Sequence, residues 1–343
     1  MYPVLLDILR CPRCHGSFAL DPSASDVPAR GGASGSIEEG RLQCAGCAQR
    51  YPIVVGVPCL TVEEGVVPAT RRGFEYQWRR RQAGRTERRS TVYGYDIAKF
   101  MAWLTGLFAS DPGVFPHGSW LLDAGCGSGE KARELALRFP RSQVVAMDLS
   151  GSLAVTARMN ADVPNLHFVE ANVLCPPIRP ESCAFVMSIG VLHHTPDTQR
   201  AFDAVASLVA PGGGLLTWIY PLPGEDTFWA ALYRQRDRHF LGLGHRLPSP
   251  LTIALCHVYV ALLFPFVLRF LKQQYAVNRE RFPIYPDHPT LGDLYKSSVF
   301  LSFDNVMPAH QFRHGRTEVA DWYRTHGFGQ LDDRYSGFFY ATR

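Results

Sequence analysis

Short apolar runs separated by amphipathic segments fill the middle of the chain. Residues 120–123, 143–148, 166–170, 184–189 and 214–220 are apolar runs of strand length, and residues 130–139, 152–160 and 196–208 between them are rich in helix formers. Strands and helices that alternate at this spacing predict parallel βαβ units, and therefore an α/β fold. We expect a helix at 317–325 and a hairpin of strands at 329–334 and 337–342 to follow.

A glycine loop follows the first predicted strand. Gly125, Gly127 and Gly129 occupy every second position after Asp123, and they predict a tight turn because only glycine adopts positive φ without a Cβ clash. A strand, a glycine turn and a helix form a nucleotide-sized site at the switch point of an open α/β sheet. A dinucleotide site would need a glycine where this chain has Glu130, so the spacing favours a ligand without a pyrophosphate.

A carboxylate is expected beside this loop. Asp148 ends the second predicted strand, where an acidic residue can accept hydrogen bonds from both hydroxyls of a ribose. The loop and this acid together resemble the class I S-adenosylmethionine-dependent methyltransferases, with their D-x-G-x-G-x-G loop. The resemblance covers residues 116–221 and 313–343, and residues 188–194 resemble the fourth-strand exit of the ubiquinone/menaquinone-type branch.

The resemblance implies a Rossmann-like sheet that binds S-adenosylmethionine. The residues that match the family's cofactor site are Asp123, Gly125, Cys126, Gly127, Gly129, Asp148, Leu149, Asn172, Val173 and Ser188. The family usually has an aspartate where this chain has Asn172, and that aspartate contacts the adenine amine. The amide oxygen of Asn172 can still accept such a hydrogen bond.

Two C-x-x-C pairs precede this domain. Cys11, Cys14, Cys44 and Cys47 can close a tetrahedron on zinc with Zn–S bonds of about 2.3 Å, although a redox motif or a chance pairing is the alternative. The Ser-, Gly- and Pro-rich stretch between the pairs predicts a flexible loop. The flanks resemble the small zinc-ribbon proteins that activate tRNA, rRNA and protein methyltransferases by strand pairing. This resemblance implies a structural zinc in a domain at 1–60 that docks in cis.

Two further segments interrupt the predicted domains. Residues 61–115 are expected to form a linker and an N-terminal helical lid, and within them residues 71–89 hold eight arginines and two glutamates. The alternatives for this arginine-rich segment are a solvated helix and a nucleic-acid-binding surface. A second helix is expected at 93–108. Residues 222–312 form a helical lid insertion between the core segments 116–221 and 313–343. Leu247–Leu268 carries no charge if His257 is neutral, which fits a lid over an apolar pocket, interfacial membrane contact or a membrane span.

Catalysis of methyl transfer needs alignment of donor and acceptor and, for an acceptor with a proton, a base that titrates near the working pH. His193 and His194, at the fourth-strand exit, are the candidate bases, and Tyr220 is a candidate to orient the substrate. His310 and His314 are outside candidates. The paired histidines could instead cap the next helix or bind the substrate passively. The exit lacks the N/D-P-P-aromatic motif of enzymes that methylate base or amide nitrogen.

Composition adds few constraints. A hydrophobic content of 46% and a net charge of +4 describe an ordinary globular protein that requires no polyanionic partner. No signal peptide pattern opens the sequence, and nine cysteines fit a reducing cytoplasm. We therefore predict a cytoplasmic, zinc-containing methyltransferase that acts on O or C of a small apolar acceptor, isoprenoid or aromatic, with no nucleic-acid partner. The alternative functions are an RNA methyltransferase and a non-catalytic cofactor-binding scaffold. Peripheral contact with a membrane is a further expectation. The sequence makes no prediction of the oligomeric state.

Overall fold

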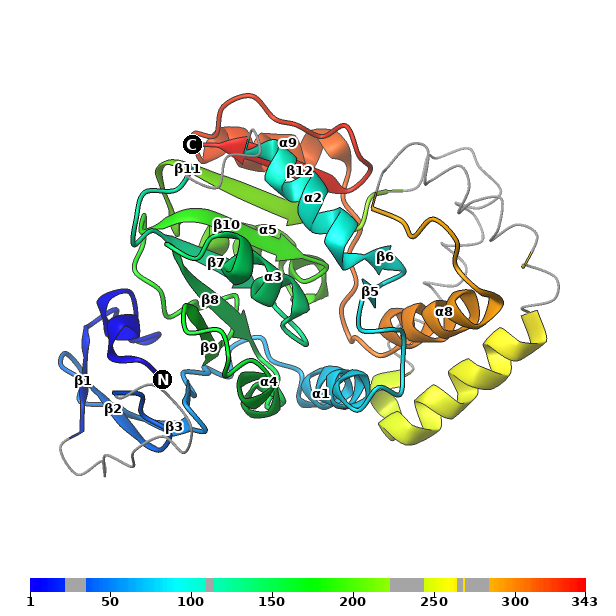
Figure 1. Ribbon diagram of the computed structural model, residues 1–343, viewed down its shortest axis with the longest axis horizontal. Coiled ribbons are helices and arrows are strands. Elements are labelled where there is room, and N and C mark those ends of the chain that lie inside the picture. Colours follow the sequence, from blue (N-terminus) through cyan, green and yellow to red (C-terminus); the bar gives the residue numbers. More distant parts are fainter. Residues whose placement is uncertain (22–34, 109–113, 223–243, 264–267, 269–283) are drawn as a thin grey trace. The chain divides into compact units, whose positions relative to one another are not determined.

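The computed structural model describes residues 1–21, 35–108, 114–222, 244–263, 268 and 284–343 (Figure 1). The chain forms two compact units. The first consists of Met1–Val66, Phe115–Pro221 and Phe312–Arg343. The second consists of Val67–Val114 and Leu222–Gln311.

A six-stranded sheet with the order β12-β11-β10-β7-β8-β9 is the centre of the first unit. Its strands are β7 (Trp120–Ala124), β8 (Gln143–Asp148), β9 (Leu166–Glu170), β10 (Cys183–Ile189), β11 (Val209–Trp218) and β12 (Phe338–Thr342). All neighbours are parallel except β11 and β12, which are antiparallel. The order of the strands and their parallel pairing confirm the predicted Rossmann-like α/β sheet.

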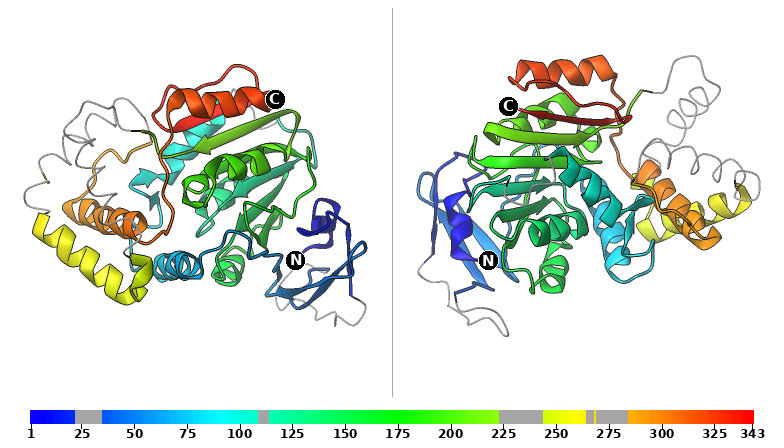
Figure 2. Two further views of the ribbon diagram at one scale, coloured as in Figure 1. Left: turned by 180° about the vertical axis from the view of Figure 1, so that it is seen from behind. Right: turned by 45° about the horizontal axis from the view of Figure 1, so that its top comes forward.

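Helices on both sides of this sheet explain why its central strands are mainly apolar (Figures 1 and 2). These helices are α3 (Glu130–Arg138), α4 (Leu153–Met159), α5 (Thr198–Ala206) and α9 (Arg316–Thr325). All five residues of β7 are buried. The side chain of Asp197 accepts a hydrogen bond from the Arg200 N–H and so caps the start of α5.

Two predictions for the far edge of the sheet are wrong in detail. Strand β11 begins at Val209 rather than 214, because its glycine-rich start pairs with the chain end: the Gly212 N–H donates to the carbonyl oxygen of Arg343 at 2.8 Å. Residues 329–334 are not a strand. Only Asp332 forms an antiparallel bridge, with Tyr340, and its carboxylate pairs with Arg334 two residues later, which is turn-like local pairing.

The amino-terminal ribbon is a small antiparallel sheet that extends the large one. Its elements are the 3₁₀ helix η1 (Pro3–Asp7) and the strands β1 (Phe18–Leu20), β2 (Gly40–Cys44), β3 (Arg50–Val54) and β4 (Val57–Pro58). After β4, Cys59 bridges Glu170 in parallel, and the Leu60 N–H donates to the Glu170 carbonyl at 2.7 Å. Leu9 also bridges Ile178. The ribbon therefore docks in cis by strand pairing, as its resemblance implied.

One continuous hydrophobic core joins the ribbon to the Rossmann-like sheet. Leu5 and Leu42 of the ribbon belong to the same buried cluster as Val145 and Val169 of the sheet. Buried apolar area stabilises a fold by about 25 cal/mol per Å². The ribbon and the sheet are thus expected to fold as one cooperative body.

The second unit is helical. It contains α1 (Pro68–Gln82), the strands β5 (Thr91–Val92) and β6 (Tyr95–Asp96), α2 (Ile97–Leu107), η3 (Gly244–Arg246), a helix over residues 249–263, and α8 (Leu291–Val306). The helix expected at 93–108 begins only at Ile97, because the preceding residues form the β5–β6 hairpin and the Asp96 side chain caps the helix by accepting the Lys99 N–H at 3.0 Å.

The arginine-rich segment is not solvated throughout. The side chains of Arg81 and Glu87 are each only 1% exposed, and their nearest charged atoms lie 3.6 Å apart. Arg81 also donates to the carbonyl oxygen of Thr91 at 2.5 Å, and burial raises the pKa of the Glu87 carboxyl. The interpretation of this segment as a solvated helix is therefore wrong at Arg81, which ties α1 to the hairpin.

The charge-free stretch Leu247–Leu268 lies partly outside the described residues. Its described part, 249–263, is helical. In the ranges that the structure describes, no helix has both the length and the apolar character needed to cross a bilayer. A lid over the cofactor pocket stays a prediction.

Candidate functional site

Four of the expected cofactor residues come together at one edge of the sheet. Asp123, Asp148, Asn172 and Ser188 end or follow β7, β8, β9 and β10, which are neighbours in the sheet. The carboxyl ends of parallel strands at such a switch point form the usual ligand crevice of an open α/β sheet. Cys126, Leu149 and Val173 follow the same strand ends.

The glycine loop has the backbone shape that its sequence predicts. Gly125, Gly127 and Gly129 have φ values of 91°, 57° and 83°, in the left-handed region. A Cβ atom on Gly125 would lie 2.2 Å from Cγ2 of Val191, so no other residue fits at this position. The loop therefore packs against the β10 exit and presents bare backbone at the strand ends.

Asp148 closes the loop from the neighbouring strand. Its Oδ2 accepts a hydrogen bond from the Gly127 N–H and its Oδ1 one from the Ser150 N–H, both at 2.8 Å. Burial raises the pKa of this carboxyl, and the backbone N–H donors oppose that shift. Each carboxylate oxygen keeps a further lone pair, so Asp148 can hold the loop and still accept ligand hydroxyls.

Asp123 is a buried carboxylate that lacks a hydrogen-bond donor. It has no exposed surface, and among the described residues none donates to either of its oxygens. Burial raises its pKa to about 6, while the nearby positive charge of Lys131 acts in the opposite direction. Buried polar atoms are nearly always paired, so this orphan carboxylate fits a ligand that brings its own donor, such as an ammonium group.

Asn172 and Ser188 are already engaged by the protein. The side-chain nitrogen of Asn172 donates to the carbonyl oxygens of Val62 and Glu64, at 3.2 and 2.7 Å. The hydroxyl of Ser188 donates to the Ala124 carbonyl at 2.8 Å and so links the ends of β10 and β7. Asn172 thus anchors the segment that leaves the ribbon through its side-chain nitrogen, while the expected contact of its amide oxygen with adenine stays a prediction.

His193 lies buried just after the end of β10. It has no exposed surface, and its Nδ1 accepts a long hydrogen bond of 3.4 Å from the Tyr220 N–H. The Tyr220 ring stacks on it with a centroid separation of 3.9 Å. Burial and the neighbouring His194 lower the pKa of His193 well below its usual value. A neutral imidazole with its Nδ1 lone pair in use is suited to positioning rather than to proton abstraction.

The chain that returns from the second unit completes this aromatic cluster. The Phe312 N–H donates to the His193 carbonyl at 2.9 Å, and the His314 N–H donates to the Tyr220 carbonyl at 3.0 Å. The guanidinium of Arg313 lies 5.3 Å from the Tyr220 ring centroid. Sequence reasoning named His314 as a candidate but missed Arg313, and no local signal could have found it. His310 belongs to the second unit.

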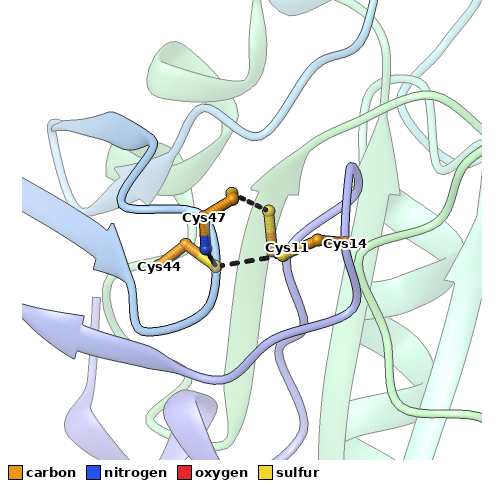
Figure 3. Close-up of side chains that lie close together, drawn as sticks. All are labelled: Cys11, Cys14, Cys44 and Cys47. Atoms are coloured by element: carbon orange, nitrogen blue, oxygen red, sulfur yellow. Dashed lines mark hydrogen bonds between the residues drawn. The ribbon is translucent and has the colours of Figure 1, made fainter.

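The four ribbon cysteines converge on one point (Figure 3). Their sulfur atoms all lie within 4.8 Å of one another, with 3.7 Å between Cys11 and Cys47 and 3.4 Å between Cys14 and Cys44. Four sulfurs around a zinc ion at about 2.3 Å are roughly 3.8 Å apart, so this cluster has the size of a zinc site. The other cysteines lie outside this cluster.

Comparison with known proteins agrees with both domains. Residues 121–213 match the methyltransferase domain family, and residues 3–56 match the Trm112p-like protein family. The ubiquinone/menaquinone biosynthesis C-methyltransferase of Syntrophotalea carbinolica is 29% identical over 124 residues, which are 35% of this chain and 52% of that protein. The demethylmenaquinone methyltransferase of Thermus thermophilus is 30% identical over 127 residues, 36% of this chain and 57% of that protein. Both predicted resemblances are therefore confirmed.

The chain spans about half the length of these curated relatives. Among solved structures, the magnesium protoporphyrin IX methyltransferase of Synechocystis, with bound SAH, has a TM-score of 0.39 and 14% identity over 72% of this chain and 81% of that chain.

Proposed function

We propose that this chain, which joins a Trm112-like zinc ribbon to a class I methyltransferase domain, is an S-adenosylmethionine-dependent methyltransferase. Its acceptor is the O or C atom of a small apolar molecule, isoprenoid or aromatic. The observation that carries the proposal is the pair of carboxylates at the strand ends, Asp148 closing the glycine loop and Asp123 buried without a donor.

Each of these residues has a role in holding the cofactor. Asp148 accepts hydrogen bonds from the ribose hydroxyls, and Asp123 accepts one from the ammonium group. The bare backbone of Gly125–Gly129 allows close approach, and Leu149 and Val173 give apolar contact. S-adenosylmethionine, when bound, supplies a methyl group that is already activated, so the protein mainly has to align the acceptor.

The acceptor side is formed by the aromatic cluster. His194, which is only partly buried, takes a proton from the acceptor, while His193 and Tyr220 fix its position through their stacked rings. The names of the two relatives support a quinone-type acceptor methylated at carbon. The cysteine cluster holds a structural zinc, and the other cysteines fit a reducing cytoplasm.

Calorimetry with S-adenosylmethionine tests the cofactor site. We expect the Asp148→Ala variant to bind about 1–3 kcal/mol more weakly, because two ribose hydroxyls lose a charged acceptor. Asp162→Ala is the matched control, because this exposed aspartate forms a surface ion pair with Arg133 and its loss should leave the affinity unchanged. Binding of NAD in place of S-adenosylmethionine would contradict the proposal.

Turnover tests the acceptor. Short-chain demethylmenaquinol, the reduced form whose ring carbon is nucleophilic, is incubated with S-adenosylmethionine and the wild-type protein. We expect the methyl group to replace the ring proton and S-adenosylhomocysteine to be released. Binding of the cofactor without release of S-adenosylhomocysteine, with this quinol and with other apolar acceptors, would favour a non-catalytic scaffold.

An RNA methyltransferase is the second candidate, supported by the match of the ribbon to the Trm112p-like family. The two candidates differ in their response to salt. RNA binding should weaken steeply as ionic strength rises, since phosphate contacts release counterions, whereas turnover of a small apolar acceptor should change little.

A further inference from the structure

One helix of the second unit exposes an apolar face. Within residues 249–263, drawn in yellow in Figure 1, the larger residues of this face are between 47% and 67% exposed. They are Leu251, Leu255, Val258, Tyr259 and Leu262. Their spacing of three and four residues places them on one side of the helix. We call this surface the exposed leucine face.

The opposite side of the same helix is packed. Cys256 and Val260 are each 5% exposed and form a buried cluster with Val299, Phe303 and Met307 of α8 and the chain after it. This packing determines which side of the helix points outward. A helix that is apolar on all sides is normally buried, and a contiguous exposed apolar patch marks a surface that meets a partner or a membrane.

Basic side chains lie on the packed side of this helix. Arg80, Arg85 and Lys296 line a hollow that also contacts Ile253 and His257, on the side opposite the exposed leucine face, and no acidic residue lines it. Arg85 and Lys296 are exposed, and the hollow itself holds only about 30 Å³, too little for a ligand larger than water. Arg246, just before the helix, is exposed as well.

The charge of the whole unit points in the same direction. From Arg238 to Arg279 the sequence has five basic residues and no acidic one. The segments of the second unit contain 18 Lys and Arg against 11 Asp and Glu, a net charge of +7, although the complete chain has only +4. Such a charge opposes association with a second copy of this unit and favours an anionic surface.

We propose that the helix over residues 249–263 lies in the plane of an anionic bilayer surface, with the exposed leucine face among the upper acyl chains, Arg246 at its amino-terminal end near the headgroups, and the positive charge of the unit drawing it to the surface. Fifteen helical residues are about 22 Å long, and an in-plane amphipathic helix of this kind need not span the hydrocarbon core. The inference rests on the proposed function in one respect: an isoprenoid acceptor is dissolved in the bilayer, so this surface brings the enzyme to its acceptor.

Flotation of the full-length protein with lipid vesicles tests the proposal. We expect binding to phosphatidylcholine vesicles that contain one third phosphatidylglycerol, and weaker binding to pure phosphatidylcholine or at high salt. The double variant Leu255→Glu/Leu262→Glu should lower the bound fraction at least about tenfold, because two charges would enter the acyl region. Leu137→Glu, a substitution at a 50% exposed leucine of the first unit, should leave binding unchanged.

Other results would overturn the proposal. These are absence of vesicle binding by the wild-type protein, or equal binding by the double variant. A dimer in sedimentation velocity without lipid that the double variant abolishes would assign the face to a second copy instead. Calorimetry with S-adenosylmethionine on the same samples separates this outcome from failure of the proposed function, because the double variant should bind the cofactor normally.

Discussion

The side-chain nitrogen of Asn172 donates a hydrogen bond to the backbone carbonyl of Glu64, at 2.7 Å. The same nitrogen donates to the carbonyl of Val62, and the amide oxygen accepts the Leu174 N–H at 3.0 Å. An aspartate at this position could not donate to two carbonyls. The asparagine, which departs from the family's usual aspartate, is therefore explained by the ribbon linker that it anchors beside the cofactor crevice.

Asn172→Asp should release this linker. We expect a loss of about 1–3 kcal/mol in the free energy of unfolding, because the two carbonyls lose their donor and face a carboxylate instead. Hydrogen exchange of the backbone N–H groups at 61–66 should become faster.

Asn165→Asp is the control for this variant. The amide of Asn165 also donates to backbone carbonyls, those of Ala136, Phe139 and Ser142, but far from the linker in sequence. It should lower stability without faster exchange at 61–66. Equal exchange at 61–66 in wild type and Asn172→Asp would show that Asn172 is not the anchor.

Metal removal should destabilise the catalytic domain and not the ribbon alone. The wild-type protein should contain one zinc per chain, and Cys14→Ser should lose it and melt at a lower temperature, because the binding energy of a structural zinc is folding energy. The shared core transmits this loss to the Rossmann-like sheet. Cys175→Ser, outside the cluster, should keep the metal. A chelator that leaves the melting temperature of the wild type unchanged would argue against the zinc site.

The two histidines at the β10 exit should differ in kinetics. His194→Ala should lower kcat by about 10²–10⁴-fold and remove the acidic limb of the pH–rate profile, as expected for loss of a general base. His193→Phe keeps a ring against Tyr220 but loses the acceptor for the Tyr220 N–H, so it should mainly raise KM and retain that limb. The reverse pattern would make His193 the base.

Stability should fall in mild acid because of His167. Burial lowers the pKa of its imidazole from 6.5 to about 4, so the unfolded chain binds the proton first as pH falls. The contribution of His167 to the free energy of unfolding should be constant above about pH 7 and decrease by up to about 3 kcal/mol between pH 6.5 and 4. His167→Phe should flatten this slope in urea titrations, and exposed His117→Gln should not. An unchanged slope in His167→Phe would exclude His167 as its source.

The central strands and the glycine loop were predictable because their signals are local. A strand buried on both faces is a continuous apolar run, and a turn with positive φ needs glycine whatever surrounds it. The two cysteine pairs are local signals too, since each pair supplies two ligands from one knuckle.

Predictions failed where a distant partner sets the conformation. Residues 209–213, which the sequence left outside the last parallel strand, belong to β11 because the Gly212 N–H pairs with the chain end at Arg343. Residues 329–334 are not a strand, because their bridge to β12 joins only Asp332 and Tyr340. The sequence predicts a solvated arginine at Arg81, in a basic helix. In the structure Arg81 is buried with Glu87 and donates to the carbonyl oxygen of Thr91, in the β5–β6 hairpin.

The sequence by itself determined the fold class, the cysteine cluster and the strand ends that form the crevice, since backbone conformation and ligand spacing at these places depend on neighbouring residues. Only the tertiary structure decided that Asn172 serves a linker 108 residues earlier in the chain, that His193 is buried under Tyr220 and Arg313, and that one face of the 249–263 helix points outward. These features depend on packing between segments that are distant in the sequence, because that packing determines which polar atoms are hydrogen-bonded and which apolar faces are removed from water.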